Sequence, residues 1–158
     1  MTQSLPHVAR ITLAIVLLSA GAGCVSVYPH TVPVYPATRP EKGLIYFFRE
    51  KQFFGSGVSY YLYRGKTRIG GLKNGTYFFH WCDPGEHTFW ARTEAKSTVT
   101  VSVEGGIIYY VRGSVTMGGL AHHPALSLVS EAYGFEAVRK LTFVTLAEDQ
   151  AKKVEQTH

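Results

Sequence analysis

The sequence predicts a mainly β protein, an antiparallel β-sandwich of about seven strands with one short C-terminal helix. From Gly43 onward, short runs of β-branched and aromatic residues alternate with turn-forming residues. Along Thr98–Glu104, valine alternates with polar residues, which is the period of a strand with one buried face. Helical periodicity first occurs after Ser130.

Residues 1–23 have the layout of an export signal peptide. Arg10 supplies a basic start, and Ile11–Ala20 is an uncharged apolar run, shorter than the roughly 20 residues that a membrane-spanning helix needs. Ala20–Cys24 places small residues before a cysteine and resembles the lipobox of bacterial lipoproteins. The resemblance implies cleavage before Cys24 and a lipid anchor, including palmitate, on Cys24. Ordinary secretion, with cleavage near the same place, is the alternative.

The residue after the cysteine indicates which membrane would hold the lipid anchor. Val25 rather than aspartate follows Cys24, which by the sorting rules of such lipoproteins implies export to the outer membrane. We therefore expect a protein of the cell envelope, with its domain in the periplasm. More than one acyl chain gives stable anchoring.

The mature chain divides into a spacer, one domain and a tail. Residues 24–41 are expected to carry the lipid and to form an extended linker, because Val25–Pro40 contains four prolines and no acidic residue. Residues 42–145 are expected to form the β-sandwich domain. Residues 146–158 are expected to be a polar C-terminal tail.

Seven runs in the domain are predicted strands. They are Leu44–Arg49, Val58–Arg64, Thr67–Leu72, Thr76–Cys82, His87–Arg92, Thr98–Glu104 and Ile107–Val115. The segments between them contain turn signals at Arg64-Gly65-Lys66, Asn74-Gly75, Asp83-Pro84-Gly85 and Gly105-Gly106. These turns predict hairpins.

The chain after the strands is predicted to cover the sheet. Ser130 is expected to cap a helix over Glu131–Lys140, and Leu141–Val144 suits a last strand or a continuation of this helix. Leu44–Phe48 and Val58–Tyr63 carry large side chains on both faces. We expect these aromatic residues to pack under the C-terminal segment, with surface recognition as the alternative.

Composition excludes several classes of protein. The chain is 46% hydrophobic and 13% aromatic, as expected for a globular domain. Its formal net charge of +5 is scattered rather than gathered in a basic stripe, so we expect no nucleic-acid partner. If Cys24 carries lipid, Cys82 has no partner for an intramolecular disulfide, and we expect its thiol to be buried.

Several motifs together resemble an uncharacterised family of bacterial lipoproteins, built on a β-rich domain of unknown function. They are Leu44–Arg49, Phe54–Gly57, Leu72–Tyr77, Pro84–Thr88 and Gly105–Val111. The resemblance covers about Leu44–Lys140. It implies a compact β domain behind a lipobox, with no assigned activity and no catalytic residues.

Catalytic residues are not expected. Ser56 lacks the glycine spacing of a nucleophile elbow. The two aspartates, Asp83 and Asp149, lie in a turn and in the polar tail, so paired-carboxylate hydrolysis is not expected either. We therefore predict a non-enzymatic protein without a cofactor.

A metal site is the alternative hypothesis. His80 and Cys82 share one face of a predicted strand, and His87 follows the next turn. Together they would make a periplasmic metal-binding or redox protein. The competing interpretation is that Cys82 fills the core and that His87 hydrogen-bonds to the turn backbone.

The segment Gln52–Gly57 is the predicted recognition loop. Phe53 and Phe54 are adjacent in a glycine-bounded loop, so both rings cannot easily point inward, and an exposed ring can anchor a partner. We expect a membrane-anchored binding or structural module that uses these phenylalanines to contact another envelope component, and we expect this component to be a protein.

Overall fold

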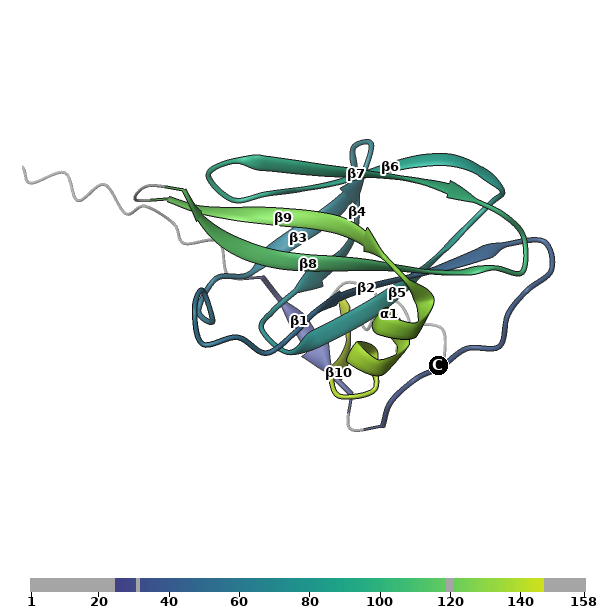
Figure 1. Ribbon diagram of the computed structural model, residues 1–158, viewed down its shortest axis with the longest axis horizontal. Helices are drawn as coiled ribbons and strands as arrows, with labels where there is room; N and C mark the ends of the chain where they lie inside the picture. The colour runs from purple at the N-terminus through teal and green to yellow at the C-terminus, as the bar shows by residue number, and fades with distance from the viewer. Residues whose placement is uncertain (1–24, 31, 119–120, 147–158) are drawn as a thin grey trace, which may run out of the picture.

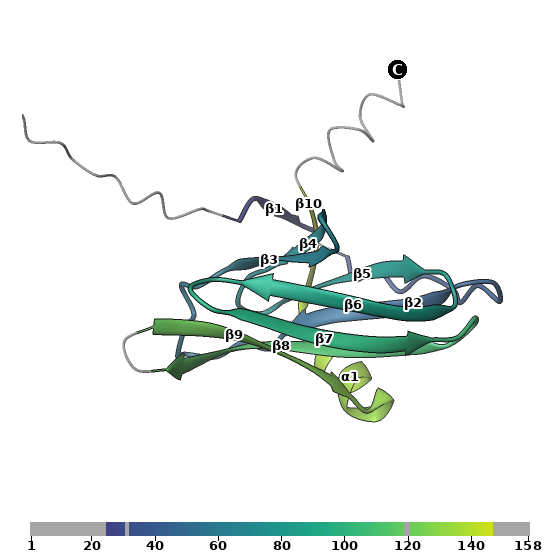
Figure 2. The same cartoon turned by 90° about the horizontal axis from the view of Figure 1, so that it is seen from above.

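Two β-sheets pack face to face in the computed structural model, which describes residues 25–30, 32–118 and 121–146 (Figure 1). The six-stranded sheet has the order β1 (Val27–Pro29), β10 (Thr142–Leu146), β5 (Thr76–Cys82), β2 (Gly43–Arg49), β8 (Ile108–Gly118) and β9 (Ala121–Val129). The four-stranded sheet has the order β4 (Thr67–Leu72), β3 (Tyr60–Arg64), β6 (Gly85–Arg92) and β7 (Lys96–Val103). The helix α1 spans Glu131–Val138 and lies against β8 (Figure 2).

The predicted fold class is confirmed, and so are all seven predicted strands. The described residues add the strands β1, β9 and β10. Most pairings are antiparallel, but β2 pairs with β8 and β10 pairs with β5 in parallel. Hairpin turns cannot predict such pairings, because parallel neighbours are joined by long connections.

The core between the sheets is aromatic. Phe47 stacks on Phe78 of the neighbouring strand with ring centroids 5.1 Å apart, and meets Phe89 of the opposite sheet edge-on at 5.0 Å. Residues alternate across a strand, so Arg49 points to the same interior as Phe47. A methyl group at Gly70 of β4 would lie 2.2 Å from the Phe78 ring, so the two sheets approach closely here.

The outer face of the six-stranded sheet is also covered. Tyr46 stacks on Tyr110 at 5.3 Å, and Gly134 of α1 sits so close that a methyl group there would meet the Tyr110 ring at 2.2 Å. On the same outer face, at β5, Tyr35 stacks on Tyr77 with ring centroids 6.3 Å apart. The expectation that the helix covers a sheet face is confirmed, and β2 is buried on both of its faces.

The C-terminal elements differ in detail from the prediction. The helix begins after Ser130 as expected, but the Ser130 side chain makes no capping hydrogen bond; its carbonyl accepts the Gly134 N–H. The helix ends at Val138, two residues earlier than predicted. Thr142–Leu146 is the last described strand, which decides between the two predicted possibilities for this segment.

The proline-rich segment, expected to be an extended spacer, is partly built into the sandwich. Val27–Pro29 is extended and pairs with β10. Val25 is only 3% exposed and packs against Gly71, and the Ser26 N–H donates to the Tyr61 hydroxyl at 2.9 Å. The chain therefore contacts the domain from Val25 onward.

Two parts of the predicted organisation lie outside the described residues. They are the signal peptide with Cys24 and nearly all of the polar tail. Within the part of the chain that the structure describes, none of the helices is both long and apolar enough to cross a membrane.

Candidate functional site

The connection between β2 and β3 presents the two predicted recognition residues. Phe53 is fully exposed, at 101% of its reference area, and Phe54 is 43% exposed. Two turn hydrogen bonds shape the loop, from the Ser56 N–H to the Phe53 carbonyl at 3.4 Å and from the Val58 N–H to the Gly55 carbonyl at 2.9 Å. The expected exposure of an aromatic ring is confirmed, and Phe53 is the more exposed of the two phenylalanines.

A buried arginine restrains this loop through hydrogen bonds. The side chain of Arg49 is 0% exposed and donates hydrogen bonds to the Gly55 carbonyl at 2.6 Å and the Val58 carbonyl at 2.5 Å. Its guanidinium also lies 5.8 Å from the centre of the Tyr60 ring. Burial lowers the pKa of Arg49. These bonds give partners to both terminal nitrogens of the buried cation, while Nε has none among the described residues, and they restrain the loop backbone.

A second set of contacts fixes the start of the loop. The Gln52 N–H donates to Asn74 Oδ1 at 2.9 Å, and Asn74 Nδ2 donates back to the Gln52 carbonyl at 3.0 Å. The Gly75 N–H donates to the Arg49 carbonyl at 3.1 Å. Gly75 has φ +78°, which favours glycine at this turn. The loop is therefore fixed at its base and ends in an exposed ring.

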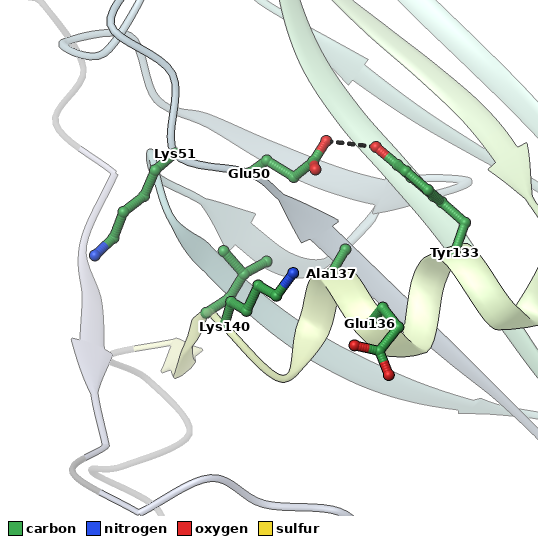
Figure 3. Close-up of a pocket in the computed structure, with 7 residues that line it drawn as sticks. Glu50, Lys51, Tyr133, Glu136, Ala137 and Lys140 are labelled. Carbon is green, nitrogen blue, oxygen red and sulfur yellow. Dashed lines mark hydrogen bonds between the residues drawn. The ribbon is translucent and has the colours of Figure 1, made fainter.

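A groove of about 390 Å³ lies next to the start of the loop (Figure 3). Glu50 and Lys51, which lead directly into the loop, line one side of it. Residues of α1 and the turn after it line the other side. The lining residues are Glu50, Lys51, Tyr133, Glu136, Ala137, Lys140 and Leu141.

Hydrogen bonds and ion pairs organise the groove. The Tyr133 hydroxyl donates to Glu50 Oε2 at 2.8 Å, as Figure 3 shows, and Arg112 Nε lies 2.8 Å from the same oxygen. The hydrogen bond to Glu50 raises the pKa of Tyr133. Glu136 pairs with Arg139 at 3.0 Å. The bond between Tyr133 and Glu50 joins α1 to the base of the loop.

The lining of the groove is both charged and apolar. The exposed lysines Lys51 and Lys140 line the groove together with Glu50 and Glu136, while Ala137 and Leu141 supply a carbon wall. The groove thus combines an apolar wall with a charged rim, and it lies beside the start of the loop that exposes Phe53.

The candidate metal ligands do not form a metal site. No group of three His, Cys, Asp or Glu side chains that could hold a metal ion occurs within residues 25–30, 32–118 and 121–146. His87 Nε2 instead lies 2.8 Å from the Asp83 carbonyl, and Cys82 is buried with Arg64 Nη1 at 3.9 Å from its sulfur. Burial raises the pKa of the Cys82 thiol. The competing interpretation of His87 and Cys82 is thus confirmed.

His80, the third candidate ligand, differs from His87 and Cys82 in its surroundings. It lies in β5, and the pKa of its imidazole is lowered to about 4, mainly by burial and further by the positive charges of Arg64 and His87. A neutral imidazole is therefore favoured at neutral pH.

Sequence reasoning missed Arg49 and the groove. The signal for Arg49 was present, because an arginine ends the otherwise apolar run Leu44–Arg49. The groove had no comparable signal, since Glu50 and Tyr133 lie 83 positions apart in the chain.

The comparisons with known proteins give one match. A family model described as "Protein of unknown function (DUF2846)" matches residues 39–125, which include the loop, its anchoring arginine and most of both sheets. No curated protein and no solved structure matches the chain.

Proposed function

Since the chain belongs to the DUF2846 family of proteins of unknown function, its role must be inferred from its own residues, and we propose that it is a lipid-anchored binding module of the bacterial envelope. In this proposal Cys24 carries the lipid, the domain works in the periplasm, and the membrane is the outer one. The module binds another envelope protein and catalyses no reaction.

The observation that carries this proposal is the exposure of Phe53 on a restrained loop. An apolar ring that is fully exposed loses the stabilisation that burial would provide, and a partner can supply that burial. Arg49 and Asn74 fix the loop at both ends, so little conformational entropy is lost when the ring is covered. Preorganised aromatic side chains are typical anchors in interfaces.

The groove beside α1 supports a protein as the partner. It offers a carbon wall with a charged rim, and Lys51 joins it directly to the loop. The groove and the loop are thus two adjacent contact surfaces.

The proposed anchor is supported by the sequence of the signal region. A basic residue, a short apolar run and small residues precede Cys24 in the order that lipoprotein processing needs. A lipid anchor would concentrate the module at the membrane, where even a weak contact with a neighbouring envelope protein becomes effective.

Cross-linking in living cells followed by mass spectrometry tests the proposal. Wild type would be compared with a groove variant, Lys140→Glu, and a loop variant, Phe53→Ala with Phe54→Ala. All three must fold and localise alike. We expect one envelope protein to be captured by wild type and to be lost, at least tenfold, from the groove variant. If no protein is specifically captured, or if the same set is captured by all three, the proposed binding surface is wrong.

A further inference from the structure

Val25, the residue that follows the proposed lipid-bearing Cys24, packs tightly on the sandwich. Val25 is buried against Gly71, and adjacent Cα atoms lie about 3.8 Å apart. A lipid on the residue before Val25 would hold this end of the sandwich at the membrane.

The same end of the sandwich carries the loop. Val25 lines a shallow hollow of about 270 Å³ together with Ser56–Ser59 and Lys73. Phe53 precedes Ser56 by three residues, so at most about 11 Å of backbone separates the exposed ring from this hollow. Figure 1 shows the connection from β2 to β3 on the same side of the molecule as the start of β1, and Figure 2 agrees.

The charges at this end suit an anionic surface. Lys51 and Lys73 are exposed, and neither the loop from Lys51 to Ser59 nor the lining of the hollow contains an aspartate or glutamate. Glu50, just before the loop, is held by Arg112 and Tyr133. Basic residues close to a membrane are attracted by anionic headgroups, and aromatic rings favour the interface between headgroups and acyl chains.

We propose that the β2–β3 loop contacts the lipid bilayer that holds the anchor. The domain sits directly on the membrane, Phe53 enters the headgroup region, and Lys51 and Lys73 face anionic headgroups. This inference rests on the lipidation of Cys24 in the proposed function. It changes one point of the proposed function: lipid rather than the protein partner covers the exposed ring of Phe53, and the protein partner binds the groove beside α1.

Tryptophan fluorescence in vesicles tests this contact. The lipidated protein would be reconstituted into vesicles of phosphatidylethanolamine and phosphatidylglycerol, with or without brominated acyl chains, which quench nearby indoles. Phe53→Trp is compared with Phe135→Trp, a matched control on exposed α1, after subtraction of the wild-type signal from Trp81 and Trp90. We expect the added emission of Phe53→Trp to fall at least twofold in brominated vesicles and that of Phe135→Trp to stay unchanged.

Charge reversal gives a second readout. Lys51→Glu with Lys73→Glu should weaken the quenching of the tryptophan at position 53. Lys66→Glu, in the turn at the far end of β3, should leave it unchanged. In vesicles without phosphatidylglycerol, the quenching of the tryptophan at position 53 should be weakened as it is in the double variant.

The outcomes separate this inference from the proposed function. Protein that does not float with vesicles and has no lipid on Cys24 overturns both. Protein that floats, but whose tryptophan at position 53 is quenched no more than the one at position 135, overturns the lipid contact alone. A cross-linker at position 53 that captures an envelope protein in cells, with no quenching in vesicles, would assign the loop to the protein partner instead.

Discussion

Arg49 donates a hydrogen bond from its buried guanidinium to the carbonyl of Gly55, with the two atoms 2.6 Å apart. This contact joins the core of the sandwich to the loop that exposes Phe53. A second bond, to the Val58 carbonyl, holds the other side of the same loop. The loop thus presents its aromatic ring from a fixed backbone.

Replacing Arg49 tests this restraint. Arg49→Met should lower the free energy of unfolding by about 1–3 kcal/mol, because two carbonyls lose their donor. Amide hydrogen exchange at Ser56 and Val58 should become faster than in wild type. Arg92→Met, at an exposed arginine in β6, should change stability by less than about 0.5 kcal/mol. Urea unfolding and exchange measurements check both, and unchanged exchange in Arg49→Met would contradict the restraint.

The close approach of the two sheets predicts a second effect. Gly70→Ala would place a methyl group 2.2 Å from the Phe78 ring and should destabilise the protein by about 1–3 kcal/mol through overpacking. Gly57→Ala is the matched control, since a methyl group there meets nothing within 4 Å. Thermal or urea unfolding of the two variants measures the difference. Equal stability would show that the sheets are not packed as described.

His80 predicts a pH dependence of stability. Its pKa is lowered from 6.5 to about 4 in the folded protein, mainly by burial, so between these values the unfolded chain binds more protons. Stability should therefore fall as the pH falls from about 6.5 to 4. His80→Gln should show a shallower fall over this window, while the contributions of the carboxylates remain. Urea unfolding at several pH values measures the slopes, and identical slopes would refute the assignment to His80.

The packing of Val25 predicts local effects at the start of the domain. Val25→Asp places a carboxylate against Gly71 and should speed amide exchange in β1, with β2 little affected. Val32→Asp, at a residue 68% exposed, should leave exchange in both strands as in wild type. Residue-resolved hydrogen exchange checks this. Fast exchange of β1 in wild type would show that the segment does not pack on the sandwich.

The sequence was sufficient for the elements whose signals are local. Alternating valines in Thr98–Glu104 and the turn at Asn74-Gly75 predicted β7 and the β4–β5 connection. The strand β9 was missed because it contains His122, His123 and Pro124, a composition typical of a loop. Proline is tolerated there because β9 is an edge strand, where an absent N–H need not break a ladder on both sides.

The pairing of strands that lie far apart in the chain could not be predicted from the sequence. The strand β1 has three residues, one of them proline, and its partner β10 lies more than 100 positions away. Within the candidate site, the exposure of Phe53 followed from two adjacent aromatic residues beside a glycine. The restraint by Arg49 and the groove between Glu50 and Tyr133 depend on tertiary contacts that no local pattern encodes.

Intact mass spectrometry of the mature protein, extracted from the cell membrane fraction, tests the central proposal most directly. The account predicts a chain that begins at Cys24 and carries the added mass of diacylglycerol and a further acyl chain. Cys24→Ala should leave the precursor uncleaved at this position and without lipid. A mature wild-type protein that starts elsewhere, or that is released without added mass, would contradict the lipid anchor.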